Sequence, residues 1–234
     1  MTGSAHAAAL YYADRRTLDA ATVAALVTAE DRQRVVPSMH VRRSAEYLAG
    51  RALLRHALAR HTGRHAASFR LETSAAGKPS CVDGPAISVS HSGDILVCAL
   101  ADSGPIGVDV ETRAPRELGT LAERFFTRAE ASWLAADPER RFRMLWVLKE
   151  AYLKALGVGL AGGLSSLECR IEPPAVAART ADGAAVPELA LLQGNGCWIG
   201  VASLAATRLE LKAEHAALDG SDDVVGPLEL FART

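Results

Sequence analysis

The chain is 234 residues long, 49% of its residues are hydrophobic, and its formal net charge is −1 at pH 7. This near-neutral charge argues against a nucleic-acid-binding protein, so any anion site must be local. Charged residues interrupt the apolar stretches, none of which approaches the roughly 18 residues that would span a bilayer, and we expect no transmembrane helix.

The N-terminal segment, residues 1–10, lacks the basic start and the apolar length of a secretory signal, so we expect a cytoplasmic protein. The chain has 4 cysteines, and no two of them form a C-x-x-C pair. We therefore expect free, mostly buried thiols and no zinc or redox motif. A chain of this length can bury a large core as one domain or as two small ones.

Hydrophobic periodicity predicts helices followed by strands in the first half of the chain. The helices are expected over residues 18–36 and 45–61, and the second of them has a clearly apolar side. The strands of this half are expected over residues 69–72, 86–91, 95–101 and 106–111.

The second half repeats this order of helices and then strands. We predict helices over residues 128–136 and 141–156. Residues 175–186 are rich in Ala, Thr and Gly without a clear period, which indicates a loop. Residues 193–196 contain Asn-Gly between two apolar runs, which predicts a hairpin turn. The strands are expected over residues 167–172, 188–192, 198–204 and 208–214.

A polar stretch at residues 112–119, punctuated by Pro115 and Gly119, separates the two halves. The simplest fold class is therefore α+β, with two similar α+β subdomains in pseudo-twofold tandem, residues 1–114 and 115–234. Two halves in one chain favour a monomer. A site between them would lie at their interface, where clefts are common.

Two acidic residues separated by one valine end the last predicted strand of the first half. In the segment Gly107-Val-Asp-Val-Glu111, Asp109 and Glu111 point to one face of a strand, and Val108 and Val110 point to the other. One face can therefore bind while the other packs. Taken alone, such a triplet is more typical of an edge strand with a solvated face than of a ligand pair.

A third carboxylate and a lysine lie on the last predicted helix. Glu150 and Lys154 are four residues apart in a segment free of Pro and Gly, so they share a helix face. Alone, this spacing is more typical of a solvated surface pair. Together with Asp109 and Glu111, however, Glu150 completes the carboxylate set that Mg²⁺ takes alongside water and a substrate phosphate. Mn²⁺ suits the same all-oxygen site.

Two shorter motifs upstream suit phosphate binding. Lys78 stands between Gly77, which permits close backbone approach, and Pro79, which stiffens the segment. By itself this tripeptide is more typical of an ordinary turn. Ser90 and His91 end an apolar strand, where a hydroxyl and an imidazole can donate to phosphate oxygens. As a nucleophile and its base they would belong to a hydrolase, but the chain has no G-x-S-x-G elbow and that interpretation leaves the acidic pair unexplained.

These segments resemble, in the same order, the signature blocks of the 4′-phosphopantetheinyl transferases. The resemblance covers residues 43–160, and the length and single-chain layout are similar to the Sfp type rather than to the short trimeric type that serves fatty-acid synthesis. It implies a transferase of secondary metabolism that serves polyketide or nonribosomal peptide synthesis. The segments that carry it are Gly107-Val-Asp-Val-Glu111, Trp146-Val-Leu-Lys-Glu150 with Lys154 and Gly157-Val-Gly159, and, more weakly, Gly77-Lys-Pro79 and Ser88-Val-Ser-His-Ser-Gly93.

The resemblance also implies which residues contact coenzyme A. The family usually supplies an arginine for the 3′-phosphate at the position of Glu46, and a carboxylate cannot do that work. Arg43 and Arg51, before and after it, are the available substitutes, and ordinary surface arginines of a helix are an equally good interpretation of the pair. The remaining coenzyme A contacts that the resemblance implies are Lys78, Pro79, Ser90, His91, Lys149 and Lys154.

The implied reaction moves the 4′-phosphopantetheinyl group from coenzyme A to a serine of an apo acyl or peptidyl carrier protein and releases 3′,5′-ADP. Mg²⁺ held by Asp109, Glu111 and Glu150 would grip the pyrophosphate during the attack. Glu150 is either a ligand only or also the base for the serine proton, and Lys154 and Lys149 stabilise the phosphate charge. The expected catalytic set is thus Glu150, Lys154 and Asp109.

Two alternatives differ from this reaction. A non-catalytic coenzyme A- or carrier-binding module of the same fold would bind its ligand without turnover, but it would not need all three acids and Lys154. A different metal-dependent phosphotransfer or pyrophosphate-cleaving enzyme would use the same acids on a nucleotide, without a protein acceptor. An assay with coenzyme A, Mg²⁺ and an apo carrier protein separates all three.

Overall fold

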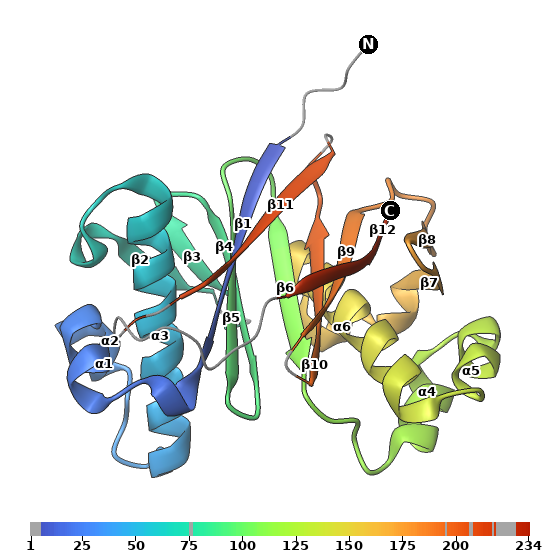
Figure 1. Ribbon diagram of the computed structural model, residues 1–234, viewed down its shortest axis with the longest axis horizontal. Helices are drawn as coiled ribbons and strands as arrows, with labels where there is room; N and C mark the ends of the chain where they lie inside the picture. Colours follow the sequence, from blue (N-terminus) through green and yellow to red (C-terminus); the bar gives the residue numbers. More distant parts are fainter. Residues whose placement is uncertain (1–5, 75–76, 195, 206–207, 217, 219–227) are drawn as a thin grey trace.

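Two β-sheets stand side by side in the middle of the molecule, and helices cover their outer faces (Figure 1). The computed structural model describes residues 6–74, 77–194, 196–205, 208–216, 218 and 228–234. Helices and sheets form two lobes that follow each other along the chain, which confirms the expected α+β class with two subdomains in tandem.

The first sheet has four strands in the order β11-β1-β5-β4. Its outer face carries α3 (Val41–Thr62), the longest helix of this lobe, and the short helices α1 (Ala20–Leu26) and α2 (Ala29–Gln33) lie against α3. A separate hairpin pairs β2 (Arg70–Thr73) with β3 (Pro79–Val82). The strands of the sheet are β1 (His6–Asp14), β4 (Ala86–Ser92), β5 (Ile95–Ala101) and β11 (Leu209–His215).

The second sheet has six strands in the order β6-β10-β9-β12-β8-β7. Helix α6 (Pro138–Leu156) lies across it, and α4 (Leu118–Phe125) and α5 (Arg128–Leu134) pack beside α6. The strands are β6 (Ile106–Glu111), β7 (Leu167–Glu172), β8 (Ala175–Thr180), β9 (Glu188–Gly194), β10 (Cys197–Ser203) and β12 (Glu229–Arg233).

The central strands are buried on both faces, because alternate side chains enter different cores. In β5, Leu96 and Leu100 pack against α3, whereas Val97 joins the core between the sheets. In β10, Ile199 enters that same central core, whereas Trp198 packs toward α6. This two-sided burial explains why β5 and β10 are apolar runs without polar alternation.

Each half of the chain contributes a strand to the other half's sheet. Strand β6 comes from the first half and pairs antiparallel with β10, and β11 comes from the second half and pairs parallel with β1. The lobes are therefore interlocked, and the division at residue 114 stays a prediction. Short 3₁₀ turns lie at Arg15–Thr17, Ala66–Ser68, Gly159–Gly162 and Leu164–Ser166.

Several elements differ from those predicted. The helix expected over residues 18–36 is two helices, because Thr28 caps α2 by accepting a hydrogen bond from Asp31 N, which interrupts the helical path. Residues 175–180, expected in a loop, form β8, where Val176 and Thr180 are buried in alternation with exposed alanines. Strands β1, β3 and β12 and helix α4 lie where no element was predicted.

The hairpin predicted at residues 193–196 is confirmed by the antiparallel pairing of β9 with β10, although residue 195 lies outside the described residues. None of the helices in the described part of the chain combines the length and the apolar character that crossing a bilayer requires.

Candidate functional site at the junction of the two sheets

Helix α6 lies directly on strands β6 and β10, because two glycines remove the side chains that would keep it away. A Cβ atom on Gly107 would stand 1.9 Å from the Ala151 carbonyl oxygen, and one on Gly200 would stand 2.3 Å from the Val147 carbonyl oxygen. This close approach holds the polar face of β6 against the polar face of α6. The valines of β6 point the other way into the central core, as the sequence predicts.

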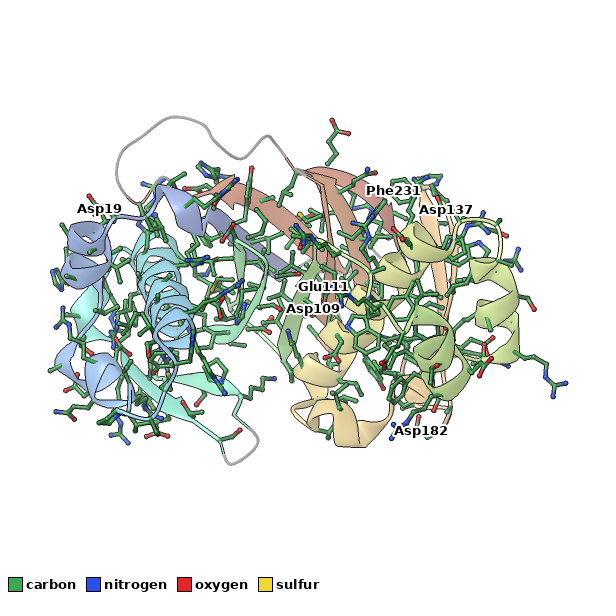
Figure 2. The ribbon with its side chains drawn as sticks, turned by 90° about the horizontal axis from the view of Figure 1, so that it is seen from below. Asp19, Asp109, Glu111, Asp137, Asp182 and Phe231 are labelled. Carbon is green, nitrogen blue, oxygen red and sulfur yellow. The ribbon has the colours of Figure 1, made fainter. Side chains whose placement is uncertain are left out.

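Ser90, Asp109 and Lys154 form a triangle of hydrogen bonds, which we call the polar triangle. Ser90 Oγ donates to Asp109 Oδ1 over 2.8 Å, and Lys154 Nζ donates to Ser90 Oγ over 2.8 Å and to Asp109 Oδ1 over 2.7 Å. The three residues come from β4, β6 and α6, so the triangle ties the edge of one sheet to the other sheet and its helix. Asp109 and neighbouring Glu111 lie centrally between the two lobes (Figure 2).

A row of serines on β4 faces the free edge of β6. Ser88 Oγ accepts from Val108 N over 3.0 Å, and Ser92 Oγ accepts from Thr112 N over 3.1 Å. Ser92 Oγ also donates to Glu111 Oε2 over 2.8 Å. The hydroxyls at every second residue thus replace a backbone ladder between the two sheets and present Ser90 to Asp109.

Burial raises the pKa of both glutamates of the predicted metal site. Burial raises the pKa of Glu111 to about 7, and the negative charges of Asp109 and Glu150 add to the effect. The hydrogen bond from Ser92 and the positive charge of Lys154 oppose it. For Glu150, burial and the negative charge of Asp109 raise the pKa, while Lys154 opposes them. The three carboxylates therefore act on one another electrostatically, and a cation among them would relieve both burial and repulsion.

The donor set fits an oxygen-ligated divalent cation. Asp109 Oδ2 is buried and has no hydrogen-bond partner among the described residues, and a buried anionic oxygen of this kind is suited to accept a metal ion. Within the described part of the chain, no group of three or more His, Cys, Asp or Glu side chains is gathered closely enough to be a finished metal site. Glu111 and Glu150 are thus electrostatic neighbours of Asp109, not members of an assembled ligand cluster.

A cavity of about 500 Å³ opens on the other side of β4, between that strand, α3 and the β2–β3 hairpin. We call it the arginine pocket. His91 lines it and is adjacent in sequence to Ser90, so the pocket and the polar triangle lie on opposite faces of one strand. Four residues predicted to contact coenzyme A are among its walls: Arg43, Arg51, Pro79 and His91.

Arg51 is the most constrained of these residues. It is 6% exposed, its Nε donates to the Tyr47 hydroxyl over 3.1 Å, and its Nη2 donates to Thr73 Oγ1 over 3.3 Å. Its Nη1 is buried and has no partner among the described residues. Arg43, by contrast, is exposed at the rim, and Glu46 forms an ion pair with Arg42 over 2.9 Å.

Lys78 joins the β2–β3 hairpin to the end of α6. Its ammonium donates to the carbonyl oxygens of Lys154 and of Ala155, the latter over 3.1 Å. Burial lowers its pKa. A cation at the C-terminus of a helix complements the helix dipole, so Lys78 links the arginine pocket to the turn that carries Lys154.

The position of Lys149 corrects one prediction. Its side chain is fully buried, and Nζ donates to the Leu164 carbonyl oxygen over 3.0 Å, to the Leu167 carbonyl oxygen and to Glu130 Oε1 over 2.9 Å. Adjacent helix residues are separated by about 100°, so Lys149 points into the second lobe while Glu150 faces β6. The ammonium has no surface free for a phosphate, and we remove Lys149 from the expected coenzyme A contacts.

Several polar residues that build the site were not predicted from the sequence. Ser88 and Ser92 could have been found from the alternation Ser88-Val-Ser-His-Ser92, which places three hydroxyls on one strand face. The sequence gives no sign that Asp31 lies beside Arg51. An acidic residue in the first turn of a helix is already explained by capping, so its presence there does not point to a second role.

Comparisons with known proteins agree with this geometry. A family model described as the 4′-phosphopantetheinyl transferase superfamily matches residues 105–198, and one described as the 4′-phosphopantetheinyl transferase N-terminal domain matches residues 30–101. The first match includes β6 and α6, and the second includes the walls of the arginine pocket.

Curated relatives resemble the chain over much of its length. It is 37% identical over 130 residues to 4′-phosphopantetheinyl transferase psf-1 of Bacillus pumilus, covering 53% of this chain and 55% of that protein. It is 34% identical over 151 residues to 4′-phosphopantetheinyl transferase Sfp of Bacillus subtilis, covering 62% and 66%. A further 4′-phosphopantetheinyl transferase of Bacillus subtilis is 35% identical over 154 residues, covering 63% and 68%. The chain thus spans between about half and two thirds of the length of these relatives.

Proposed function

This chain belongs to the 4′-phosphopantetheinyl transferase superfamily, and we propose that it transfers the 4′-phosphopantetheinyl group of coenzyme A to a serine of an apo acyl or peptidyl carrier protein. The observation that carries the proposal is the polar triangle of Ser90, Asp109 and Lys154 beside Glu111 and Glu150. It combines hydrogen-bond donors for phosphate with carboxylates for a divalent cation, at the junction of two lobes.

Coenzyme A carries a pyrophosphate and a separate 3′-phosphate, and we propose a place for each. Arg51 and Arg43 in the arginine pocket would receive the 3′-phosphate, because guanidinium groups match phosphate geometry. The pyrophosphate would lie across the end of β4, where His91 on the pocket side and Lys154 on the side of the polar triangle can donate to its oxygens, and Ser90 would turn its hydroxyl from Asp109 to a phosphate oxygen. Lys78 would act at the same end, from its place against the C-terminus of α6.

Asp109, Glu111 and Glu150 would hold Mg²⁺, and Mn²⁺ suits the same oxygens. The bound ion would neutralise charge on the pyrophosphate oxygens. The chain's own groups do the rest. Lys154 would donate to the phosphoryl oxygens as their charge shifts toward the leaving group, and Glu150, whose pKa burial raises, would accept the proton of the attacking serine hydroxyl.

In this reaction a bond forms between the serine oxygen and the pantetheine-side phosphorus. The bond from that phosphorus to the oxygen bridging to 3′,5′-ADP breaks, and 3′,5′-ADP leaves with the electron pair. The serine proton passes to Glu150, directly or through water. Atoms and charge balance without any further reactant.

The test is an assay with coenzyme A, Mg²⁺ and an apo carrier protein, followed by intact mass of the carrier and by detection of 3′,5′-ADP. We expect a phosphopantetheinyl adduct and equal 3′,5′-ADP. Binding of coenzyme A without an adduct on any apo carrier protein would instead indicate a non-catalytic module, and cleavage of coenzyme A without an acceptor would indicate a pyrophosphate-cleaving enzyme.

Glu150→Gln should lower the rate of transfer by about 10²-fold or more while the fold survives, because it removes a proton acceptor and a metal oxygen without changing shape. The matched control is Glu139→Gln, on the exposed first turn of the same helix, which should transfer at the wild-type rate. Full activity of Glu150→Gln would remove this residue from the chemistry.

A further inference from the structure

We propose that Asp31 and Arg55 are positioning residues that fix the guanidinium of Arg51 in the wall of the arginine pocket, and that this fixed guanidinium makes the pocket selective for a ligand with a terminal phosphomonoester. The inference rests on the proposed function only for the identity of that ligand, coenzyme A with its 3′-phosphate. It assigns roles to two buried residues that the sequence analysis does not single out.

Asp31 divides its two oxygens between two arginines of the next long helix. It is 3% exposed, Oδ2 accepts from Arg55 Nε over 2.5 Å, and Oδ1 lies 3.6 Å from Arg51 Nε. The carboxylate is itself held by the capping box of α2, in which Oδ2 accepts from Thr28 N over 3.1 Å. Burial alone raises the pKa of Asp31, but hydrogen bonds from Arg55 and Thr28 N and the charges of both arginines outweigh it, so the pKa is lowered.

Arg55 is the fixed member of the pair. It is 2% exposed and is not among the lining residues of the pocket; besides the bond from Nε to Asp31, Nη1 donates to the carbonyl oxygens of Ala66 over 2.9 Å and Phe69 over 3.2 Å, and Nη2 donates to Thr28 Oγ1 over 3.1 Å. These bonds join α3 to α2 and to the segment before β2. Arg55 therefore anchors Asp31. Asp31 also faces Arg51, which lies one helical turn before Arg55 on α3.

Arg51 is the member with unused donor capacity. Tyr47 and Thr73 engage Nε and Nη2, and Nη1 is buried without a partner among the described residues. A guanidinium is always charged, so a desolvated donor of this kind is unfavourable until an acceptor arrives. Arg51 lines the cavity, so an anion that enters the cavity lies beside a guanidinium whose Nη1 lacks an acceptor among the described residues.

The charges around the pocket lead to the same conclusion. One carboxylate, Asp31, faces the two guanidiniums of Arg51 and Arg55, so among the described residues one of these buried positive charges has no carboxylate of its own. Glu46, the carboxylate among the lining residues, is paired with Arg42. Arg43 adds a further positive charge at the rim. A doubly negative phosphomonoester matches this surplus, whereas a neutral ribose hydroxyl does not.

The test compares dissociation constants for coenzyme A and for 3′-dephospho-coenzyme A, measured by calorimetry on the full chain. Asp31→Asn keeps the shape of the side chain and removes its charge. We expect the wild type to prefer coenzyme A by about tenfold or more, the factor of one hydrogen bond to a charged group. The variant adds positive charge beside the pocket but no longer fixes the Arg51 guanidinium, so, if position decides, it should lose most of this preference while its affinity for 3′-dephospho-coenzyme A stays unchanged.

The control is Glu123→Gln on the exposed side of α4 in the other lobe, which makes the same charge change and should keep the wild-type preference. In turnover, Asp31→Asn should raise the KM for coenzyme A and leave kcat near the wild-type value. A variant that weakens both ligands equally, or that keeps the full preference while folded, would overturn the positioning role.

A second pair of variants covers the case in which Asp31→Asn does not fold. Thr28→Ala removes the hydroxyl that engages both Asp31 N and Arg55 Nη2, and Thr28→Ser keeps it. We expect partial loss of the phosphate preference in the alanine variant and none in the serine variant; equal preferences in the two would overturn the inference. Preference without any carrier modification would reject only the proposed function, and modification without preference would reject only this inference.

Discussion

Lys154 carries much of the organisation of the site, because its ammonium contacts two oxygens that come from different sheets. It lies 2.8 Å from Ser90 Oγ and 2.7 Å from Asp109 Oδ1, and its side chain stays 28% exposed. A partly exposed lysine can move toward an arriving phosphate, whereas the buried Asp109 cannot. Ser90 accepts a hydrogen bond from Lys154 and donates one to Asp109, so each of the two bonds polarises the hydroxyl and strengthens the other.

Ser90→Ala and Ser88→Ala should separate chemistry from stability on one strand. Ser90→Ala removes a hydroxyl from the polar triangle, so we expect the KM for coenzyme A to rise by about tenfold with the fold intact. Ser88→Ala leaves Val108 N without its acceptor, which should cost about 1–3 kcal/mol of unfolding free energy and spare the KM. Urea unfolding and steady-state kinetics measure both, and the reverse assignment of effects would contradict the roles of the two serines.

His56 should make the protein less stable in mild acid. It is half-buried on α3, and burial, followed by the charge of Arg60, lowers its pKa, while Glu214 opposes them. As the pH falls below the ordinary histidine pKa of about 6.5, the unfolded chain takes up a proton that the folded chain does not, so the free energy of unfolding decreases.

The measurement is chemical unfolding of the wild type and of His56→Gln between about pH 7.5 and 5, a window that includes the ordinary histidine pKa. The variant cannot bind this proton in either state, so its stability should depend less on pH across the window. Identical slopes for the two proteins would show that His56 does not contribute.

Among the elements, α6 joins the site to the second lobe through its two faces. Glu150 and Lys154 face β6, and Lys149, on another side of the helix, enters a buried network with Glu130, Leu164 and Leu167. Glu130 also accepts from Cys169 N over 2.9 Å and from Thr127 N over 2.8 Å. One ion pair thus connects α5, α6, the turn after α6 and β7.

Lys149→Met should destabilise the protein by about 3–5 kcal/mol, because it leaves the carboxylate of Glu130 buried without its cation. Adding Glu130→Gln should restore part of the loss, since the double variant carries no buried charge at this place. Thermal and urea unfolding measure both effects, with the exposed Lys212→Met as control. A loss below about 1 kcal/mol, the size expected of a surface pair, would contradict the burial of this ion pair.

Elements with a regular apolar period could be predicted from the sequence. Elements without such a period could not, because nothing in their local sequence distinguishes them. The two faces of β6 follow from its alternation of valine and acid, and α6 follows from its apolar period. Strand β1 is a run of small and aromatic residues buried on both faces, so it has no period to detect. Lys149 was misplaced because a motif gives the order of residues but not the face on which each one lies.

At the scale of the whole molecule, the site depends on strands that the two halves exchange. Strand β6, which carries Asp109 and Glu111, lies in the sheet of the second half, and the serines of β4 face it from the sheet of the first. The sequence indicated an interface between halves, but not that the connection is made by side-chain hydroxyls. Such pairing is long-range, and nothing local in β4 specifies its partner.

Coenzyme A with Mg²⁺ should therefore stabilise both lobes together. A ligand present at about 100 times its dissociation constant adds roughly 2.7 kcal/mol, which corresponds to roughly 5–10 °C in Tm for a chain of this size. Because the polar triangle, the arginine pocket and α6 all contribute, calorimetry should show one transition that moves as a whole. A chelator should remove the part of the shift that needs the metal, and Asp109→Asn should lose that same part. Two transitions, of which only one responds to the ligand, would show that the lobes unfold independently and that the site belongs to one of them.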